Sequence, residues 1–502
     1  MQRTQIHWFG KPPDDAQATL VEEHGFNLVV HGRTSSPDFR YACAALFWAT
    51  DGYFSQAAPS LRDHLKAALN DGVYLASIVS PAADFTCLQD VKDLFSEADP
   101  TEAVKPHRVL TEPVELHKLL HHVLLHTPGA ARDIALKITG DVEVDKESRF
   151  LLQRAFHDCR AIKLESITPG HSKAETFIVR ATLKDSFAGP EPRPFFTKLG
   201  ISTKLQKEML AFRQYAEHHV PWYLRPNFIP ERIAYGVENG ILVGNFVPNS
   251  CSLAEAVRKG DGAQHVRSLF EETLAGLRQQ FQTTAVASQE RSVISALKEF
   301  CKLEKAPATR WETAKQLFGG DMVDPQALWW RLVDLPRREW RKSAIHGDLH
   351  GENVRVRKDD AILIDFAHAC TGPASADLAQ LEVSLAFDTM EGDEQGEEWR
   401  AIVMNLYSAE AIRASLQPQA VAVSGTWIHE VVAEIRSLAC ASVTGEDEYM
   451  RVLAVYLLRQ GCLPESKKLT AQNEYRRTFA YWLACRLTEH LDMATSVQTL
   501  SA

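Results

Sequence analysis

Hydrophobic and polar positions follow two alternating patterns over the first quarter of the chain. Short apolar runs of strand length alternate with longer stretches in which apolar residues recur every three or four positions. The runs predict strands at 5–9, 26–30, 44–49, 73–79 and 108–110, and the longer stretches predict helices at 15–24, 61–70, 85–95 and 114–125. Such alternation is typical of a doubly wound parallel sheet, so residues 1–127 are predicted to form one α/β domain.

A second pattern, rich in strands, begins after a break at Thr127, Pro128 and Gly129. Residues 128–159 form either a connector or an extension of the next domain, and residues 160–247 are predicted to be a small β-rich domain. The predicted strands lie at 134–138, 161–164, 176–181, 195–200 and 240–248, and the predicted helices at 146–158 and 204–215.

Residues 248–502 form the third stretch, which becomes mostly helical toward its end. Two strand-like runs, 354–356 and 361–364, flank the polar residues 358–360 and predict a β-hairpin. After residue 377, the helical period predicts helices at 378–387, 397–415, 426–441, 449–458 and 472–493.

Three polar residues flank this hairpin and carry the candidate chemistry. Asp348 and Asn353 are five positions apart just before the first strand, and Asp365 follows the second strand. Because the two strands of a hairpin are neighbours, we expect Asn353 and Asp365 to lie close together. Phosphoryl transfer requires such a set: one carboxylate to orient a hydroxyl, and an amide oxygen with a second carboxylate to bind Mg²⁺.

These segments resemble the catalytic segments of the aminoglycoside phosphotransferase and choline kinase family. The resemblance is carried by the run HGDLHGEN, from His346 to Asn353, and by the run IDF, which contains Asp365. It implies that Asp348 is the catalytic residue, that Asn353 and Asp365 bind the metal, and that the cofactors are Mg²⁺ with ATP or GTP.

The resemblance also implies a fold and supporting roles. The fold would be a two-lobed protein-kinase-like fold, with the small lobe at 160–247 and the large lobe at 248–502. His346 and His350 would shape the catalytic loop, and Asp377, in an Asp-Leu-Ala segment, would brace this loop. An apolar helix follows Asp377, so a helix N-cap is an alternative and compatible role for it.

In the small lobe, one lysine and one glutamate are candidates for orienting the nucleotide. Lys198 lies in an apolar strand, where a buried lysine needs a partner, and Glu208 lies in the following helix. In kinases a strand lysine contacts the α and β phosphates and is oriented by a helix glutamate, and we assign these roles to Lys198 and Glu208. The alternative is an exposed lysine and a solvated glutamate, with Lys204 and Glu217 as competitors.

Two further segments are predicted to contact the nucleotide. The turn that contains Gly170, His171 and Ser172 joins two strands, and its backbone N–H groups would cover the phosphates. Asn245 and Val247 end the strand that links the two lobes, where the backbone would contact the adenine edge. A plain hairpin and a plain buried strand are the alternatives for these two segments.

The N-terminal α/β domain resembles the flavodoxin-like receiver domain of response regulators but lacks residues that a working receiver needs. Asp51 follows the third strand, as a phosphoacceptor would. Residues 10–13 intervene where the family has an acidic pair, and residues 111–113 lack the lysine that stabilises the phosphate. We therefore expect a degenerate receiver-like domain that contacts a protein partner or a second copy through the helices at 85–95 and 114–125.

Composition narrows the class of protein. The 502 residues are too many for one compact domain, and 45% hydrophobic with 24% charged residues is ordinary for a globular protein. The net charge of −10 argues against a nucleic-acid-binding protein. No apolar run reaches the roughly 20 residues that span a bilayer, and the N-terminus does not resemble a signal peptide. Nine scattered cysteines are typical of reduced thiols in the cytoplasm and argue against a zinc site.

The sequence therefore predicts an ATP- and Mg²⁺-dependent phosphotransferase that transfers the γ-phosphate to a hydroxyl acceptor. The expected acceptor is a small hydroxyl or amino-alcohol compound, and neither nucleic acid nor membrane is expected as a partner. The acidic residues 391–398 could attract a cationic acceptor, although such a run is more often a solvated loop. The alternatives are a pseudokinase or nucleotide-responsive regulatory scaffold, and a Ser/Thr protein kinase.

Overall fold

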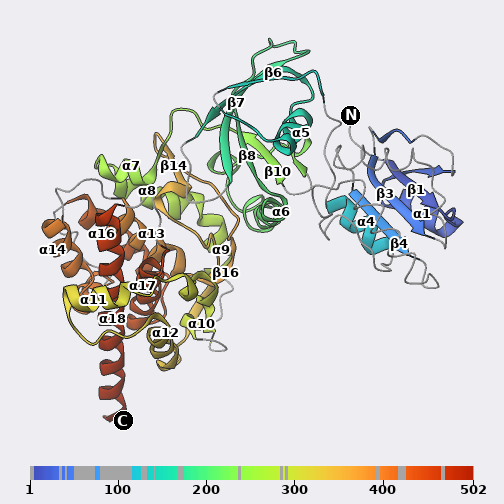
Figure 1. The fold of residues 1–502 in the computed structure, drawn as a ribbon. Coiled ribbons are helices and arrows are strands. Elements are labelled where there is room, and N and C mark those ends of the chain that lie inside the picture. Colours follow the sequence, from blue (N-terminus) through green and yellow to red (C-terminus); the bar gives the residue numbers. More distant parts are fainter. Residues whose placement is uncertain are drawn as a thin grey trace. The chain divides into compact units, whose positions relative to one another are not determined.

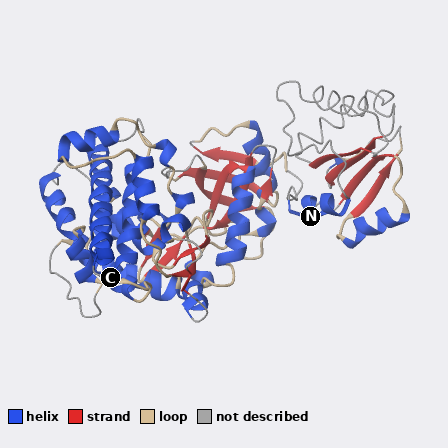
Figure 2. Cartoon of the chain, turned by 90° about the horizontal axis from the view of Figure 1, so that it is seen from below, coloured by secondary structure: helices blue, strands red, loops and turns tan. Residues whose placement is uncertain are grey.

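A computed structural model describes residues 5–32, 37–39, 42–49, 74–79, 116–125, 133–140, 142–167, 174–235, 239–282, 287–288, 292–389, 396–416, 426–464 and 470–500. The chain divides into two compact units (Figure 1). The first contains Met1–Gln206 and Asn227–Phe246, and the second contains Lys207–Pro226 and Val247–Ala502. Helices make up most of the second unit (Figure 2).

The first unit begins with a parallel sheet of strand order β2-β1-β3-β4. Its strands are β1 (Gln5–Gly10), β2 (Asn27–His31), β3 (Ala42–Ala49) and β4 (Tyr74–Val79). The connection from β1 to β2 is α1 (Asp15–Glu23), which begins at an Asp14 carboxylate that accepts a hydrogen bond from the Gln17 backbone N–H at 2.8 Å. The parallel pairing agrees with the predicted α/β domain. Its receiver-like assignment stays a prediction, because Asp51 and the predicted elements at 61–70, 85–95 and 108–110 lie outside the described residues.

The apolar face of α4 (Leu116–Leu125) belongs to the core of this N-terminal sheet. Leu119, Leu120 and Val123 are buried together with Ile6 and other residues of the sheet. The helix predicted at 114–125, which corresponds to α4, was expected to contact a protein partner or a second copy. The structure uses the apolar side chains of α4 to cover the domain's own sheet, so their apolar character is no argument for a partner.

The second part of the first unit is a six-stranded sheet of order β5-β6-β7-β8-β10-β9. All neighbouring strands pair antiparallel except β5 and β6, which are parallel. The strands are β5 (Lys137–Gly140), β6 (Cys159–Ser166), β7 (Glu175–Leu183), β8 (Phe195–Ile201), β9 (Ala234–Tyr235) and β10 (Asn239–Asn245). The strand predicted at 134–138 begins later, because Asp133 accepts a hydrogen bond from the Ala135 backbone N–H and forms a turn there.

One face of this sheet is closed by α5 (Lys146–Ala155), which lies against it in Figure 1. Leu151 and Leu152 of α5 join Phe195 and Leu199 of β8 in the hydrophobic core. Helix α5 ends at Ala155, three residues before the end of the helix predicted at 146–158. The predicted helix at 204–215 is α6 (Ser202–Ala211) followed by a π-helical turn at Phe212–Ala216.

The second unit contains two three-stranded sheets and a large group of helices. The sheets have strand orders β11-β14-β15 and β12-β13-β16. Their strands are β11 (Cys251–Ser252), β12 (Ala287–Ser288), β13 (Trp340–Ile345), β14 (Val354–Arg357), β15 (Asp360–Leu363) and β16 (Cys370–Pro373). The helices are α7 (Leu253–Arg258), α8 (Gly262–Ser268), α9 (Ala275–Gln282), α10 (Val293–Ala296), α11 (Arg310–Phe318), α12 (Pro325–Asp334), α13 (Ala376–Asp388), α14 (Gly396–Leu406), α15 (Ala409–Ser415), α16 (Trp427–Cys440), α17 (Glu446–Gly461) and α18 (Ala471–Leu500).

Helix α17 is the centre of the helical group. Every residue from Tyr449 to Leu458 is buried, and the helix packs against α13 and α18. A helix buried on all sides lies inside a core, so the position of α17 is fixed by packing around its whole circumference. This fixed position matters because the last turn of α17 reaches the candidate site.

The predicted single helix at 397–415 was wrong. The structure has two helices there, α14 and α15, with a break at Tyr407 and Ser408. The Ser408 hydroxyl accepts a hydrogen bond from the Ala411 backbone N–H at 3.2 Å and so begins the second helix.

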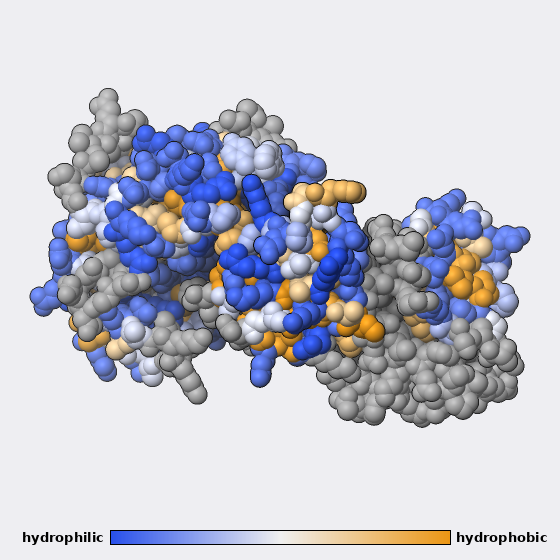
Figure 3. Space-filling view, turned by 90° about the horizontal axis from the view of Figure 1, so that it is seen from above, coloured by the Kyte–Doolittle hydropathy of each residue, from blue (hydrophilic) through white to orange (hydrophobic). Residues whose placement is uncertain are grey.

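No described helix is long and apolar enough to cross a membrane. On the face shown in Figure 3, hydrophilic residues predominate and hydrophobic residues form small groups among them.

Candidate active site

The candidate catalytic residues lie on connected segments of the second unit. The loop from His346 to His350 leaves β13, turns through a 3₁₀ helix at Gly351–Asn353, and enters β14. β14 pairs antiparallel with β15 from Val354 opposite Leu363 to Arg357 opposite Asp360, which confirms the predicted hairpin. The chain then passes through Asp365 to β16, which returns to pair with β13.

The side chain of Asp377 holds the start of this loop. Its Oδ2 accepts a hydrogen bond from the His346 backbone N–H at 2.7 Å, and its Oδ1 accepts one from the Gly347 backbone N–H at 3.0 Å. Asp377 is only 5% exposed, and burial raises the pKa of its carboxyl against the opposing effect of these hydrogen bonds and of His346. Asp377 lies in the first turn of α13, and its side chain binds the loop. The N-cap residue of this helix is Ser375, whose side chain forms no capping hydrogen bond.

Gly347 makes the close approach at the start of the loop possible. Its φ of 75° lies in the left-handed region, and a Cβ atom there would come within 2.4 Å of the His368 carbonyl oxygen. The neighbouring His346 is fully buried, and its Nε2 is 3.0 Å from the Ile364 carbonyl oxygen. Its ring also meets Phe366 edge to face. His346 therefore ties the loop to the segment that carries Asp365.

Asn353 and Asp365 are neighbours across the open end of the hairpin. The Ile364 backbone N–H donates to the Asn353 carbonyl oxygen at 2.9 Å, so Asp365 directly follows a residue bonded to Asn353. The Asn353 amide nitrogen donates to the Asp348 carbonyl oxygen at 2.9 Å, which leaves its amide oxygen for another partner. Asp365 has a φ of 61°, a left-handed conformation that aspartate adopts more readily than most residues.

The carboxylate of Asp348 is held through one of its two oxygens. Gln380 Nε2 donates to Oδ1 at 3.0 Å, and Arg459 Nη2 donates to the same atom at 2.6 Å. The other oxygen, Oδ2, forms no hydrogen bond with a described residue, and His350 Nε2 lies 3.9 Å from it. This second oxygen can therefore accept a hydrogen bond from a hydroxyl group.

Charge around Asp348 decides its protonation state. Burial would raise the pKa of this carboxyl, but the charge of Arg459 and the neighbouring His350 outweigh burial and hold the pKa well below its usual value. Asp348 is therefore a carboxylate at every ordinary assay pH. A carboxylate with a lowered pKa is a weak base. It is therefore better suited to orienting a hydroxyl through a hydrogen bond than to removing the hydroxyl proton early.

Sequence reasoning missed both residues that hold Asp348. Gln380 lies one helical turn after Asp377 on α13, and this i, i+3 spacing could have shown that both face the loop. Arg459 lies in the last turn of α17, 111 positions after Asp348. No local pattern in the sequence connects Arg459 with the catalytic loop, because the contact depends on how α17 packs.

The predicted nucleotide-orienting residues fall in both units. Lys198 is buried at 7% exposure in the middle of the six-stranded sheet, between Thr176 of β7 and Leu242 of β10. It alternates with Leu199, so it lies on the face opposite the core under α5. Glu208 is buried on α6 and belongs to the second unit. The pairing of Lys198 with Glu208 stays a prediction.

The other predicted nucleotide contacts are described in part. Asn245 is exposed at the end of β10, and its backbone N–H donates to the Asn227 carbonyl oxygen at 3.2 Å. The Val247 carbonyl oxygen accepts a hydrogen bond from the Ser250 hydroxyl at 2.9 Å. The predicted phosphate-covering turn, with Gly170, His171 and Ser172, lies outside the described residues. The contact of all these groups with a nucleotide stays a prediction.

Comparison with known families gives one match. The model of a family described as "Ternary complex associated domain 9" matches residues 281–460. This range contains Asp348, Asn353, Asp365 and Arg459 but covers less than half of the chain. A search of the curated proteins found no match.

Comparison with solved structures gives several small-molecule kinases. A choline kinase from Cryptosporidium parvum is 11% identical with a TM-score of 0.31, over 66% of this chain and 90% of that one. An aminoglycoside phosphotransferase from Streptomyces rimosus is 16% identical with a TM-score of 0.32, over 60% and 100%. A glucosamine kinase is 12% identical with a TM-score of 0.32, over 66% and 94%. Scores this low do not establish a shared fold, so the functional argument depends on the site itself.

Proposed function

We propose that the chain is a phosphotransferase with a two-lobed protein-kinase-like fold, which transfers the γ-phosphate of ATP or GTP to a hydroxyl acceptor. One observation carries the proposal. Asp348 keeps one carboxylate oxygen available while Asn353 and Asp365 lie side by side at the open end of the same hairpin. Phosphoryl transfer consists mainly of positioning and charge stabilisation, and these three groups supply the acceptor-orienting and metal-binding parts of it.

The donor set fits Mg²⁺ bound together with a nucleotide. Among the described residues, no group of three or more His, Cys, Asp or Glu side chains could hold a metal ion. Mg²⁺ in phosphoryl-transfer sites needs only one or two carboxylates, because phosphate oxygens and water complete its coordination. The Asn353 amide oxygen and the Asp365 carboxylate would hold it, and the bound metal would neutralise charge on the phosphates. Lys198 is the candidate for contacting the α and β phosphates.

The acceptor is proposed to be a small hydroxyl or amino-alcohol compound. The similar solved structures include kinases named for choline, glucosamine and aminoglycosides, and these are the first compounds to test. Of the acidic run 391–398, which could attract a cationic acceptor, residues 391–395 lie outside the described residues. Its role stays a prediction.

The test has two steps, binding and transfer. Mg²⁺ with ATP should raise the melting temperature of the full chain, and the increase should be smaller for Asp365→Ala. Labelled ATP should then transfer its γ-phosphate to a member of a panel of choline, aminoglycosides, amino sugars and amino alcohols. Asp348→Asn should keep the nucleotide-dependent melting shift and lose transfer. If neither ATP nor GTP binds with Mg²⁺, the proposal is wrong.

A nucleotide-responsive scaffold is the second candidate function. It is favoured by the matching family, whose description refers to a ternary complex. Such a protein would bind Mg²⁺ and ATP without transferring phosphate. The isotope experiment separates the possibilities: label on a small molecule supports the enzyme, label on protein supports a protein kinase, and binding without transfer supports the scaffold.

A further inference from the structure

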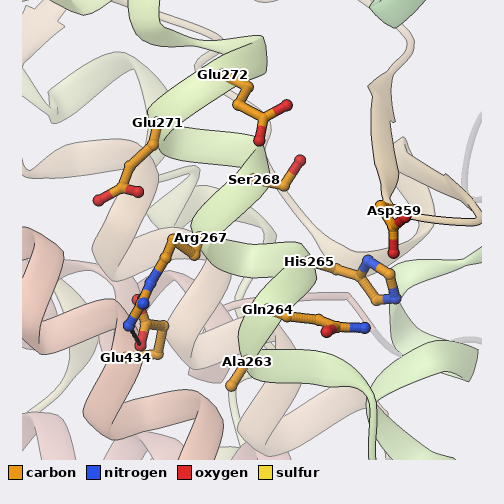
Figure 4. A pocket seen from close by; sticks show the side chains of 9 residues that line it. All are labelled: Ala263, Gln264, His265, Arg267, Ser268, Glu271, Glu272, Asp359 and Glu434. Atoms are coloured by element: carbon orange, nitrogen blue, oxygen red, sulfur yellow. Dashed lines mark hydrogen bonds and ion pairs between the residues drawn. The ribbon is translucent and has the colours of Figure 1, made fainter.

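A polar cavity lies on the second unit, away from the candidate catalytic residues. It has a volume of about 370 Å³ and is lined by α8, the turn that follows it, the β14–β15 turn and α16 (Figure 4). Its lining residues are Ala263, Gln264, His265, Arg267, Ser268, Glu271, Glu272, Asp359 and Glu434. Asp359 belongs to the closed end of the hairpin whose open end carries Asn353. At about 3.4 Å per strand residue, the two ends are on the order of 15 Å apart.

Two buried side chains at the base of this cavity have polar atoms without partners. His265 is 4% exposed and Ser268 is 9% exposed. Neither His265 Nδ1 nor Ser268 Oγ has a hydrogen-bond partner among the described residues. Buried polar atoms are nearly always paired, so two of them lining one cavity indicate a site for a hydrogen-bonding ligand. Figure 4 shows both side chains directed to the same side of the helix, facing Asp359 and Glu272.

The rim of the cavity is acidic. Glu271, Glu272 and Asp359 are exposed and form no ion pair with a described residue. Glu434 is already neutralised by Arg267, whose guanidinium donates to both of its oxygens at 2.8 and 2.7 Å. Two of these carboxylates, those of Glu272 and Asp359, lie on the same side of the helix as His265 and Ser268, whereas Glu271 points to the other side (Figure 4).

The local helix geometry brings these groups together. Ser268 ends α8, and a π-helical turn at Leu269–Thr273 follows. π-helical turns are rare and occur often at functional sites. The turn is anchored by the buried Thr273 hydroxyl, which donates to the Ala361 carbonyl oxygen of β15 at 2.5 Å. Glu272 is thus held beside Ser268, and the hairpin that carries Asp359 is held against the turn.

The same groups determine what the cavity can bind. Burial lowers the pKa of His265, against the charges of Asp261 and Asp359 that raise it, so the imidazole is neutral near pH 7 and one of its nitrogens accepts hydrogen bonds. The Ser268 hydroxyl oxygen, an imidazole nitrogen of His265 and the carboxylates of Glu272 and Asp359 can all accept hydrogen bonds. Their matching ligand is a positively charged group with several N–H donors.

We propose that this cavity binds an alkylammonium or guanidinium group, carried either by a small polyamine or by a lysine or arginine side chain of a protein. The group would donate to Ser268 and His265 at the base and pair with the carboxylates of Glu272 and Asp359 at the rim. This site is separate from the proposed phosphotransferase site, and its binding does not require catalysis.

Calorimetric titration of the full chain tests the proposal. The probes are spermidine and agmatine as small cations, and the capped peptide acetyl-Gly-Arg-Gly-amide as a protein side chain. The same peptide with citrulline in place of arginine is the matched neutral control. We expect saturable binding of a cation, at least tenfold weaker binding of the citrulline peptide, and weakening as salt concentration rises.

Variants assign the binding to this cavity. Glu272→Gln and Ser268→Ala should each weaken cation binding by about tenfold, as expected for a lost charged partner and a lost hydrogen bond. Glu312→Gln, an exposed glutamate on α11 outside the cavity, should leave binding unchanged. If Ser268→Ala fails to fold, Glu272→Gln decides alone, because Glu272 is exposed.

Three outcomes overturn the proposal: no saturable binding of any cation, equal affinity for the citrulline peptide, or equal affinity of Glu272→Gln and the wild type. Binding of the peptide without the free amines assigns the cavity to a protein partner. Binding of a free amine without the peptide assigns it to a small molecule.

Discussion

Arg459 is the residue whose replacement tests most directly how the catalytic loop works. It donates to Asp348 Oδ1 at 2.6 Å and comes from a helix whose position is fixed by burial. Arg459→Ala removes one of the two donors that orient the carboxylate, and leaves Gln380 as the other. We expect Asp348 to sample other orientations, so that its second oxygen is less often aligned with an acceptor.

The size of the effect follows from the geometry of this pair. A hydrogen bond between charged groups contributes about 1.5–3 kcal/mol net, and about 1.4 kcal/mol corresponds to a tenfold change in rate. The side chains of Arg459 and Asp348 are 25% and 26% exposed, so solvent screens part of their attraction. The expected loss therefore lies toward the lower end of the range, at about 10- to 30-fold in turnover.

The assay needs no knowledge of the acceptor, because water can replace it. Slow hydrolysis of ATP with Mg²⁺ is measured for the wild type, Arg459→Ala and Arg459→Lys over a range of pH. The charge of Arg459 lowers the pKa of Asp348, so its removal raises this pKa. The carboxylate is the working form, and the rate of Arg459→Ala should therefore fall with decreasing pH where the wild-type rate is still constant. Arg459→Lys should restore the flat pH profile.

Arg486→Ala is the matched control, since Arg486 also pairs with a carboxylate, Glu489, but on the exposed surface of α18. It should leave both the rate and the pH profile unchanged. If Arg459→Ala still binds ATP and hydrolyses it with the wild-type rate and pH profile, Arg459 does not position Asp348.

Three further predictions concern other parts of the chain. Burial and the neighbouring His31 lower the pKa of His7 to about 4. The N-terminal sheet should therefore lose up to about 3 kcal/mol of stability as pH falls from 6.5 toward 4. Hydrogen exchange of β1 measures this loss, which His7→Gln should reduce. Arg436→Ala should destabilise the second unit by roughly 3–5 kcal/mol in denaturant unfolding, because it leaves Glu382 buried without its bidentate partner. Acetyl phosphate with Mg²⁺ should give no mass shift that depends on Asp51, since residues 111–113 lack the lysine that stabilises the phosphate in receiver domains.

Much of the catalytic loop could be predicted because its contacts are local. The two strand-like runs and the polar residues between them predicted a hairpin, and the structure has that hairpin with Asn353 next to the segment of Asp365. Asp377 was assigned its bracing role by the resemblance of its Asp-Leu-Ala segment, and its carboxylate accepts hydrogen bonds from two backbone N–H groups of the loop. These contacts join residues that are at most 31 positions apart.

What the sequence could not predict depends on packing between distant segments. The helices between α7 and α12 are short and irregularly spaced, so no long periodic stretch marked them. The break between α14 and α15 depends on the single hydroxyl of Ser408. The apolar face of α4 was read as a docking surface, because a sequence shows that a helix face is apolar and not what covers it.

The range of sequence separations among the contacts of Asp348 has a consequence for the order in which the site forms. Its contacts with Asn353 and Gln380 span 5 and 32 positions, whereas its contact with Arg459 spans 111. Short loops close at a lower entropic cost, so the loop and hairpin can assemble as soon as α13 has been synthesised. The charge that fixes the carboxylate arrives only when α17 docks into the core. A chain truncated before α17 would then retain Asn353 and Asp365, the proposed metal-binding pair, while its Asp348 carboxylate would be free to rotate and take up a proton. Completion of the C-terminal helical core would thus be the last step in making the site competent.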